Sequence, residues 1–218
     1  MSYNIAIDGP AGAGKSTIAK LVAKKKGYIY VDTGAMYRAM ALFMLKESVE
    51  LDRVDLIAEK SQSADISIRY EDGVQCVFLN GQNVNGMIRT EDVSAAASKT
   101  SVVPEVRKKL TALQKKLAAE QDVVMDGRDI GTKVLPNADL KIFLTASVEV
   151  RAKRRYDELC AKGERCNLEK IQEEIAERDH RDMTRDEAPL VQAEDAILVD
   201  SSDMTIEQVA DKILSYVK

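Results

Sequence analysis

The chain has 218 residues, of which 45% are hydrophobic and 31% are charged, and its formal net charge is -4. This balance is typical of a globular protein and excludes a largely disordered chain, which would carry fewer apolar residues. A net negative charge also gives no general attraction to a nucleic acid polymer or to an anionic membrane. At this length we expect one domain, residues 1–218.

The first predicted elements alternate between strand and helix. Residues 3–8 read as a buried strand, and residues 15–26 have helical spacing that ends at Gly27. A second strand is expected over residues 28–31 and a second helix over residues 34–46.

The same alternation continues in the second half of the chain. Continuous apolar runs predict strands that are covered on both faces, at residues 123–125, 140–145 and 196–199. The sequence Thr205-Ile206-Glu207-Gln208 has the pattern of a capping box and begins a C-terminal helix that runs to Tyr216. Together these elements predict an α/β fold, with a parallel sheet flanked by helices.

Two segments interrupt the alternation. Between residues 65 and 84, alternating runs are separated by the turn dipeptides Asp72-Gly73 and Asn80-Gly81, which predict antiparallel hairpins in a small β insert. Residues 148–186 are dense in charge and predict two helices joined at Lys162-Gly163.

The three cysteines and the apolar runs bear on the compartment. Cys76, Cys160 and Cys166 are odd in number and form no CxxC pair, which favours reduced thiols over a disulfide framework or a zinc site. The start of the chain has no basic segment leading into an apolar one, and the longest apolar run, residues 39–45, is far shorter than the roughly 20 residues of a membrane span. We therefore expect a cytoplasmic protein with no structural zinc and no membrane partner.

Residues 9–16, GPAGAGKS, match the pattern G-x-x-x-x-G-K-[ST] at every fixed position, between a predicted strand and a predicted helix. Glycines let the backbone amides point inward toward phosphate oxygens, and the start of the helix adds partial positive charge. Lys15 can reach the β- and γ-phosphates, and the hydroxyl of Ser16 can ligate Mg²⁺. A glycine-rich turn that only joins strand to helix would not need these four residues. The sequence therefore predicts a nucleoside triphosphate site.

The chain lacks the N-K-x-D and D-x-x-G segments with which regulatory GTPases read guanine and sense the γ-phosphate. A small kinase remains, and it needs a second site for the phosphoryl acceptor. Arginines are the candidates for that site, because guanidinium groups bind phosphate bidentately. The spacing of Arg178, Arg181 and Arg185 predicts that they share one helix face with Asp182. For Arg151, Arg154, Arg155 and Arg165, a nucleotide contact and a surface ion pair both stay open.

At this point the sequence resembles the bacterial cytidylate kinases, the CMP/dCMP kinases of the nucleoside monophosphate kinase group. The matching segments run almost from end to end: IDGPAGAGKST, DTGAMYRA, IRTEDVSAAAS, PEVR, DGRDIGT, KIFLTAS, ERDHRDMTR and APL. The resemblance implies a P-loop nucleoside monophosphate kinase fold. It also implies that residues 63–98 form an inserted monophosphate-binding region and that residues 148–186 form an arginine-rich helical lid.

The resemblance also implies site residues. ATP would bind at Gly9, Pro10, Ala11, Gly12, Ala13, Gly14, Lys15, Ser16 and Thr17, with Mg²⁺ held by Ser16. CMP would bind at Thr33, Arg38, Ser98, Arg107, Arg128, Asp129, Arg178, Asp182 and Arg185. Lys15, Arg38 and Arg128 would be the catalytic residues, and the protein is expected to be a monomer.

The resemblance thus implies transfer of the γ-phosphoryl group of ATP to CMP or dCMP. The acceptor oxygen is already anionic at neutral pH, so the reaction needs no strong general base. Cys160 and Cys166 lack the spacing of a zinc-bearing lid, and His180, the single histidine, is expected to be exposed and without a role. Two alternatives stay open: another monophosphate kinase that accepts UMP or AMP, and a nucleotide-binding module without catalytic activity.

Overall fold

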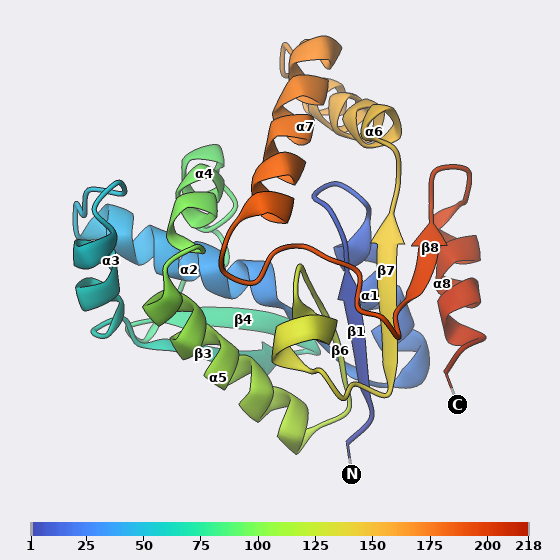
Figure 1. Cartoon of the computed structure of the whole chain (residues 1–218), viewed down its shortest axis with the longest axis horizontal. Helices are drawn as coiled ribbons and strands as arrows, with labels where there is room; N and C mark the ends of the chain where they lie inside the picture. Colours follow the sequence, from blue (N-terminus) through green and yellow to red (C-terminus); the bar gives the residue numbers. More distant parts are fainter. Residues whose placement is uncertain (1, 218) are drawn as a thin grey trace. The chain divides into compact units, whose positions relative to one another are not determined.

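The computed structural model describes residues 2–217. Five strands form one sheet in the order β2-β6-β1-β7-β8, and parallel registers join β1 to β7 and β7 to β8. The strands are β1 (Asn4–Asp8), β2 (Ile29–Asp32), β6 (Val123–Gly127), β7 (Leu140–Thr145) and β8 (Ile197–Asp200). The predicted parallel sheet is confirmed, and each of its strands lies within two residues of its expected position (Figure 1).

Two compact units divide the chain, and each is described here by itself. The first comprises residues 29–123 with Ser2, and the second comprises residues 3–28 and 124–217. The expected single domain, with an inserted region at 63–98 and a lid at 148–186, stays a prediction.

The first unit is mostly helical. Its helices are α2 (Thr33–Lys46), α3 (Val54–Ser61), α4 (Glu91–Thr100) and α5 (Pro104–Glu120). Helix α2 is largely apolar, and its buried residues Met36, Met40 and Met44 recur at the spacing of one helix face. The helix packs against α3, α4 and α5, so it forms the centre of this unit.

The first unit also contains the small antiparallel sheet that the turn dipeptides predict. Its strands are β3 (Ile66–Glu71), β4 (Val74–Leu79) and β5 (Gln82–Asn83), in the order β3-β4-β5. Asp72, Gly73, Asn80 and Gly81 all have positive φ, as a two-residue hairpin turn with left-handed central residues requires. The hairpin prediction is confirmed.

In the second unit, helix α1 (Lys15–Lys26) follows the loop after β1 and lies beside α8 (Ile206–Leu214). Helix α1 ends at Gly27, whose φ of 71° lets its N–H bond to carbonyls of the last turn. Thr205 and Gln208 form the predicted capping box at the start of α8. Both helix predictions are confirmed, although α8 ends at Leu214 rather than at Tyr216.

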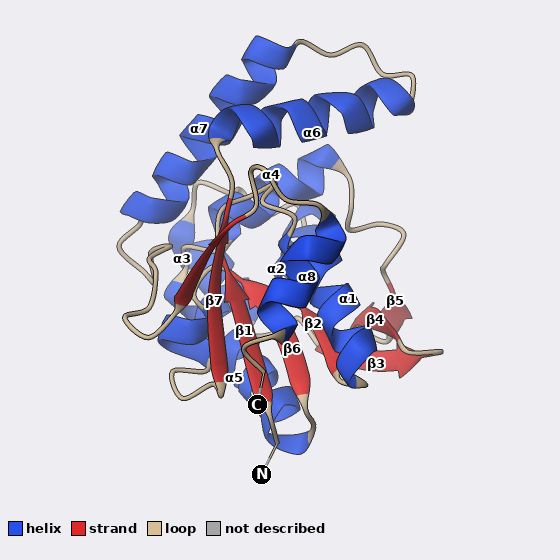
Figure 2. Ribbon diagram, turned by 90° about the vertical axis from the view of Figure 1, so that its right-hand side faces the viewer, coloured by secondary structure: helices blue, strands red, loops and turns tan. Residues whose placement is uncertain are grey.

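The charged segment of the second unit forms two helices, α6 (Val148–Ala161) and α7 (Leu168–Thr184), as the sequence predicts. They pack against each other beyond the carboxyl end of β7 (Figures 1 and 2). Gly163, with φ of 78°, ends α6, and its N–H bonds to the carbonyl of Cys160. A short π-helical turn, η1 (Ile130–Val134), follows β6, and sequence reasoning did not foresee it.

Two further features concern the cysteines and the character of the helices. All three cysteines are free thiols, and the Sγ atoms of Cys160 and Cys166 are 3.6 Å apart. Over residues 2–217, no helix combines the length and the apolar character needed to cross a membrane.

Candidate functional site

The phosphate loop, residues 9–14, joins the buried end of β1 to the start of α1. Gly9, Gly12 and Gly14 have φ of 149°, 77° and 88°, a range that favours glycine over other residues. A Cβ atom on Gly9 would lie 1.9 Å from the carbonyl oxygen of Leu144 on β7, so only glycine fits there. The strand, loop and helix that the motif requires are therefore present, and α1 starts at Lys15.

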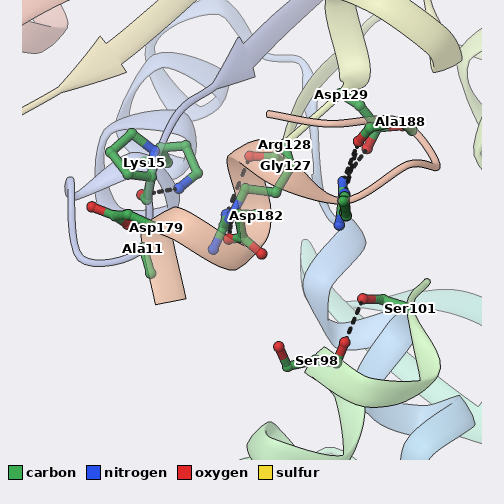
Figure 3. Close-up of polar contacts among 12 residues, drawn as sticks. Ala11, Lys15, Ser98, Ser101, Gly127, Arg128, Asp129, Asp179, Asp182 and Ala188 are labelled. Carbon is green, nitrogen blue, oxygen red and sulfur yellow. Dashed lines mark hydrogen bonds and ion pairs between the residues drawn. The ribbon is translucent and has the colours of Figure 1, made fainter. Parts of the chain in front are cut away.

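Lys15 lies at the base of the loop and is only 6% exposed. Its ammonium group donates a hydrogen bond of 2.7 Å to the carbonyl oxygen of Pro10 (Figure 3). Burial and the guanidinium of Arg128 lower the pKa of Lys15, while the carboxylates of Asp126 and Asp8 act in the opposite direction. A phosphate anion placed against this ammonium would favour its charged form.

Ser16 follows Lys15 and lies beside the end of β6. Its hydroxyl donates a hydrogen bond of 2.9 Å to Oδ2 of Asp126. The pair brings a hydroxyl and a carboxylate together at the carboxyl ends of neighbouring strands, where ligands bind in open parallel sheets. Hydroxyl and carboxylate oxygens are ligands that suit Mg²⁺.

Asp8, the last residue of β1, is a site residue that sequence reasoning missed. Its buried carboxylate accepts hydrogen bonds from the backbone N–H groups of Ile130, at 2.8 Å, and Gly131, at 2.7 Å. Burial raises the pKa of Asp8 to about 6, although those two backbone bonds act against the rise. The carboxylate therefore ties the root of the phosphate loop to the segment directly after Asp129. The one signal in the sequence is an acid at the end of an otherwise apolar strand.

Arg128 and Asp182 form an ion pair between the end of β6 and helix α7. The Nε atom of Arg128 donates to Oδ2 of Asp182 at 2.8 Å, and its Nη1 donates to the carbonyl oxygen of Gly127 (Figure 3). Burial would raise the pKa of Asp182, but Arg128 and then Arg178 and Arg185 hold it below its ordinary value. Two residues that the family resemblance assigns to CMP are thus brought into contact.

The structure corrects the prediction that three arginines share one face of α7. The helix ends at Thr184, and Arg185 adopts an extended backbone with φ of -65° and ψ of 143°. Its guanidinium donates two hydrogen bonds to the carbonyl oxygen of Ala188 and lies 3.7 Å from Asp129. Arg181 is exposed, as is His180. Arg185 therefore approaches Asp129 from the chain that follows α7.

In the first unit, Arg38 is held by the carboxylate that begins its own helix. Asp32 caps α2 by accepting from the N–H of Ala35 at 2.8 Å, and its second oxygen accepts from Nη2 of Arg38 at 3.1 Å. Arg89 also reaches this oxygen, at 3.3 Å. Thr33, next to the cap, is buried. The predicted phosphate-binding arginine of this unit is thus oriented by a fixed carboxylate.

Arg107 and Ser98 also lie in the first unit, on α5 and α4. Arg107 is 7% exposed, donates to the carbonyl oxygen of Ser101 at 3.2 Å, and lies 5.5 Å from the ring centre of Tyr37. The carbonyl oxygen of Ser98 accepts from the hydroxyl of Ser101 at 3.1 Å (Figure 3). Both residues therefore meet at Ser101.

The predicted residues fall into two groups, one in each unit. The second unit holds all the predicted ATP residues together with Arg128, Asp129, Arg178, Asp182 and Arg185. The first unit holds Thr33, Arg38, Ser98 and Arg107. Within each unit the contacts above join several members, and the assignment of these residues to ATP and CMP stays a prediction.

Comparison with known proteins supplies the family. A family model described as cytidylate kinase matches residues 5–218. The chain belongs to this family. A cytidylate kinase of Caldicellulosiruptor saccharolyticus is 54% identical over 211 residues, covering 97% of this chain and 93% of that protein. The cytidylate kinase of Bacillus subtilis is 51% identical over 215 residues, covering 99% and 96%. The resemblance that the sequence motifs indicate is thereby confirmed.

The fold has more distant relatives among solved structures. A gluconokinase from Sinorhizobium meliloti has a TM-score of 0.51 at 15% identity, covering 98% of this chain and 90% of that protein. At this identity the likeness supports the fold alone.

Proposed function

We propose that the protein transfers the γ-phosphoryl group of ATP to CMP or dCMP, which yields ADP and CDP or dCDP. The observation that carries this proposal is membership of the cytidylate kinase family over nearly the whole chain. Both the fold and the phosphate loop agree with a small kinase.

ATP binds at the phosphate loop in this proposal. The donor residues are Gly9, Pro10, Ala11, Gly12, Ala13, Gly14, Lys15, Ser16 and Thr17. Backbone amides of the loop and the start of α1 stabilise phosphate oxygens, and Lys15 adds a full positive charge. Charge that develops on the γ-phosphoryl oxygens is thus met by groups that the loop and the start of α1 hold in place.

Mg²⁺ accompanies ATP in this proposal, and the residues at the loop fit it. Ser16 and Asp126 present oxygen ligands 2.9 Å apart. When bound, the metal neutralises charge on the β- and γ-phosphates. Ser16 is the residue that would ligate it, while Asp126 accepts the hydrogen bond of the Ser16 hydroxyl and orients it.

The acceptor phosphate is bound by Arg38 and Arg128. Each of these guanidinium groups is already held by a carboxylate, that of Asp32 for Arg38 and that of Asp182 for Arg128. Such pairing orients a guanidinium before the substrate arrives, which reduces the entropy lost on binding. The attacking oxygen belongs to the acceptor phosphate and is anionic at neutral pH, so the arginines and Lys15 need only position the reactants and stabilise charge.

The nucleoside part of CMP is bound by the remaining residues. Arg178 and Asp182 contact the sugar, and Thr33 lies beside the acceptor site. Ser98, Arg107, Asp129 and Arg185 face the base. Cytosine offers an exocyclic amine, which suits an acceptor such as Asp129, and ring acceptors, which suit the arginines. Uracil would place a carbonyl against that acceptor, and an unpaired buried polar group costs about 1–3 kcal/mol.

Residues 148–186 act as a lid in this proposal. Water competes with CMP for the phosphoryl group, so a helix pair that covers the nucleotides would protect the transfer. We further propose that the protein is a cytoplasmic monomer that binds neither a nucleic acid polymer nor a membrane.

Rates with Mg-ATP and a panel of monophosphates test the function. We expect kcat/KM for CMP and dCMP to exceed that for UMP by about 5- to 150-fold, as 1–3 kcal/mol implies. A higher value for UMP or AMP would assign the chain to another monophosphate kinase. ATP binding without any diphosphate product would instead indicate a binding module.

A further inference from the structure

Arg151, in the first turn of α6, is a buried arginine that contacts three separate parts of the second unit. It is only 3% exposed. Its Nε donates to the carbonyl oxygen of Ala146 at 2.8 Å, and its Nη1 donates to the carbonyl oxygen of Ala11 at 3.0 Å. Its Nη2 donates to Oδ2 of Asp179 at 2.6 Å. One guanidinium therefore joins the chain entering α6, the phosphate loop and helix α7.

Asp179 depends on this contact. The side chain is 12% exposed, and within residues 2–217 its second oxygen, Oδ1, has no hydrogen-bond partner. A buried carboxylate is stable only when it is paired and hydrogen-bonded. Gly12 brings the loop close to the same arginine, since a Cβ atom there would lie 3.4 Å from Cβ of Arg151.

Helix α7 is thus attached at two points one turn apart. Asp179 reaches the phosphate loop through Arg151, and Asp182 reaches Arg128 at the end of β6. Residues three apart lie on one face of a helix, so both carboxylates point to the same side of α7. Arg178 and Asp182, which the proposed function assigns to the sugar of CMP, flank Asp179 in the sequence.

We propose that Arg151 and Asp179 are positioning residues, which set α7 relative to the phosphate loop so that ATP bound at the loop raises the affinity for CMP. ATP fixes the loop that carries the Ala11 carbonyl, and Arg151 transmits that position to α7. The α7 residues that contact CMP are then already partly ordered, so CMP binding costs less conformational entropy. This inference rests on the proposed function, because it takes α7 to carry residues that contact CMP.

The dissociation constant of CMP, measured by calorimetry, tests the proposal. It is determined with the protein alone and again with a saturating Mg complex of a non-hydrolysable ATP analogue. For the wild type we expect the analogue to tighten CMP binding at least about 5-fold, the lower end of common coupling between sites. For Asp179→Asn and Arg151→Lys we expect tightening of less than about 2-fold, because the loss of CMP affinity is larger with the analogue than without it.

Three further variants make the readout specific. Glu174→Gln removes an exposed acid of the same helix, paired with Lys170 at 3.8 Å, and should keep the wild-type tightening. Asp179→Glu keeps the charge and should restore part of the tightening that Asp179→Asn loses. The double variant Arg151→Lys/Asp179→Asn should lose no more than either single variant, because both changes break one contact.

Several results would overturn the proposal. One is a wild type whose CMP affinity does not respond to the analogue. Another is tightening that survives in both single variants while thermal unfolding confirms that they are folded. A third is an equal loss of CMP affinity with and without the analogue, which would indicate a general structural role. Turnover of the wild type on the monophosphate panel is independent of these results, so failure of the coupling and failure of the CMP assignment are distinguishable.

Discussion

The phosphate loop and helix α7 are held in place by different kinds of contact. The loop depends on its backbone: its glycines adopt positive φ, and Gly9 lies against the carbonyl of Leu144 with no room for a side chain. Helix α7 depends on charged side chains, with Asp179 bound by Arg151 and Asp182 bound by Arg128. A backbone-held site keeps its geometry when one side chain changes, whereas a site held by ion pairs moves when one partner is lost. We therefore expect α7 to be more adjustable than the loop.

Lys15→Ala removes the charged side chain at the base of the loop and should have the largest effect. Loss of the ammonium removes a full positive charge that stabilises the proposed transition state, so we expect turnover to fall by about 1,000-fold or more. The thermal unfolding midpoint should change little, because the backbone shapes the loop. Lys24→Ala, an exposed lysine of the same helix, is the control and should keep wild-type rates. Near-normal turnover in Lys15→Ala would contradict the assignment of the donor site.

Gly9→Ala tests whether the backbone holds the loop. The new Cβ would meet the carbonyl of Leu144 at 1.9 Å, and we expect the free energy of unfolding to fall by about 3 kcal/mol or more. Gly14→Ala is the matched control: its φ is also positive, at 88°, but a Cβ there would meet nothing within 4 Å. Its free energy of unfolding, measured by chemical denaturation, should fall by only about 1 kcal/mol. Equal losses of unfolding free energy in the two variants would show that contact with the Leu144 carbonyl does not affect stability.

Asp8 ties the start of the loop to the backbone after β6, and its titration should be visible in the free energy of unfolding. Its pKa is raised from 3.8 to about 6, so the folded state holds the proton more tightly than the unfolded state between these values. The free energy of unfolding should therefore fall as pH rises through this window, by about 3 kcal/mol from this group alone. Asp8→Asn should lack this contribution. The difference between the two unfolding curves from pH 4 to pH 8 isolates Asp8, and parallel curves would contradict the raised pKa.

Asp182→Ala tests the adjustable region and should have the smallest effect. We expect binding of both CMP and dCMP to weaken about 10-fold, as loss of one hydrogen bond to a charged group implies. A loss confined to CMP would instead indicate contact with the 2′-hydroxyl. Asp186→Ala, an exposed acid just beyond α7, is the control. Because Arg128 helps to hold the pKa of Asp182 below its ordinary value, the pair should stabilise the fold at neutral pH and weaken only below about pH 4.

Much of the fold could be predicted because local residues decide it. Gly27 ends α1 at the predicted position, and the turns at Asp72-Gly73 and Asn80-Gly81 form the small sheet. These features depend on residues next to each other in the chain. The phosphate loop was found in the same way, from a motif of eight consecutive residues.

The missed features depend on partners that are distant in the sequence. Asp8 binds backbone groups more than 120 residues away, and the spacing of charges around Asp8 gives no sign of them. Asp179 is one of many acids in a charged helix, and only its contact with Arg151 separates it from the exposed ones. Arg185 is an exception: its spacing predicts a helical position, but α7 ends at Thr184, and the guanidinium of Arg185 bonds to the nearby carbonyl of Ala188.

Gly12 shows how a neighbouring helix constrains a loop motif. The pattern G-x-x-x-x-G-K-[ST] leaves this position free. Here its φ of 77° favours glycine, and a Cβ atom added there would touch Cβ of Arg151 at 3.4 Å, an ordinary contact that leaves little room for a longer side chain. If these eight residues were transferred to another nucleotide-binding protein, Gly12 would move without its neighbour Arg151 on α6. One of the two constraints on that position would then be absent. Substitution at that position should then be tolerated better in the new host than in its original protein.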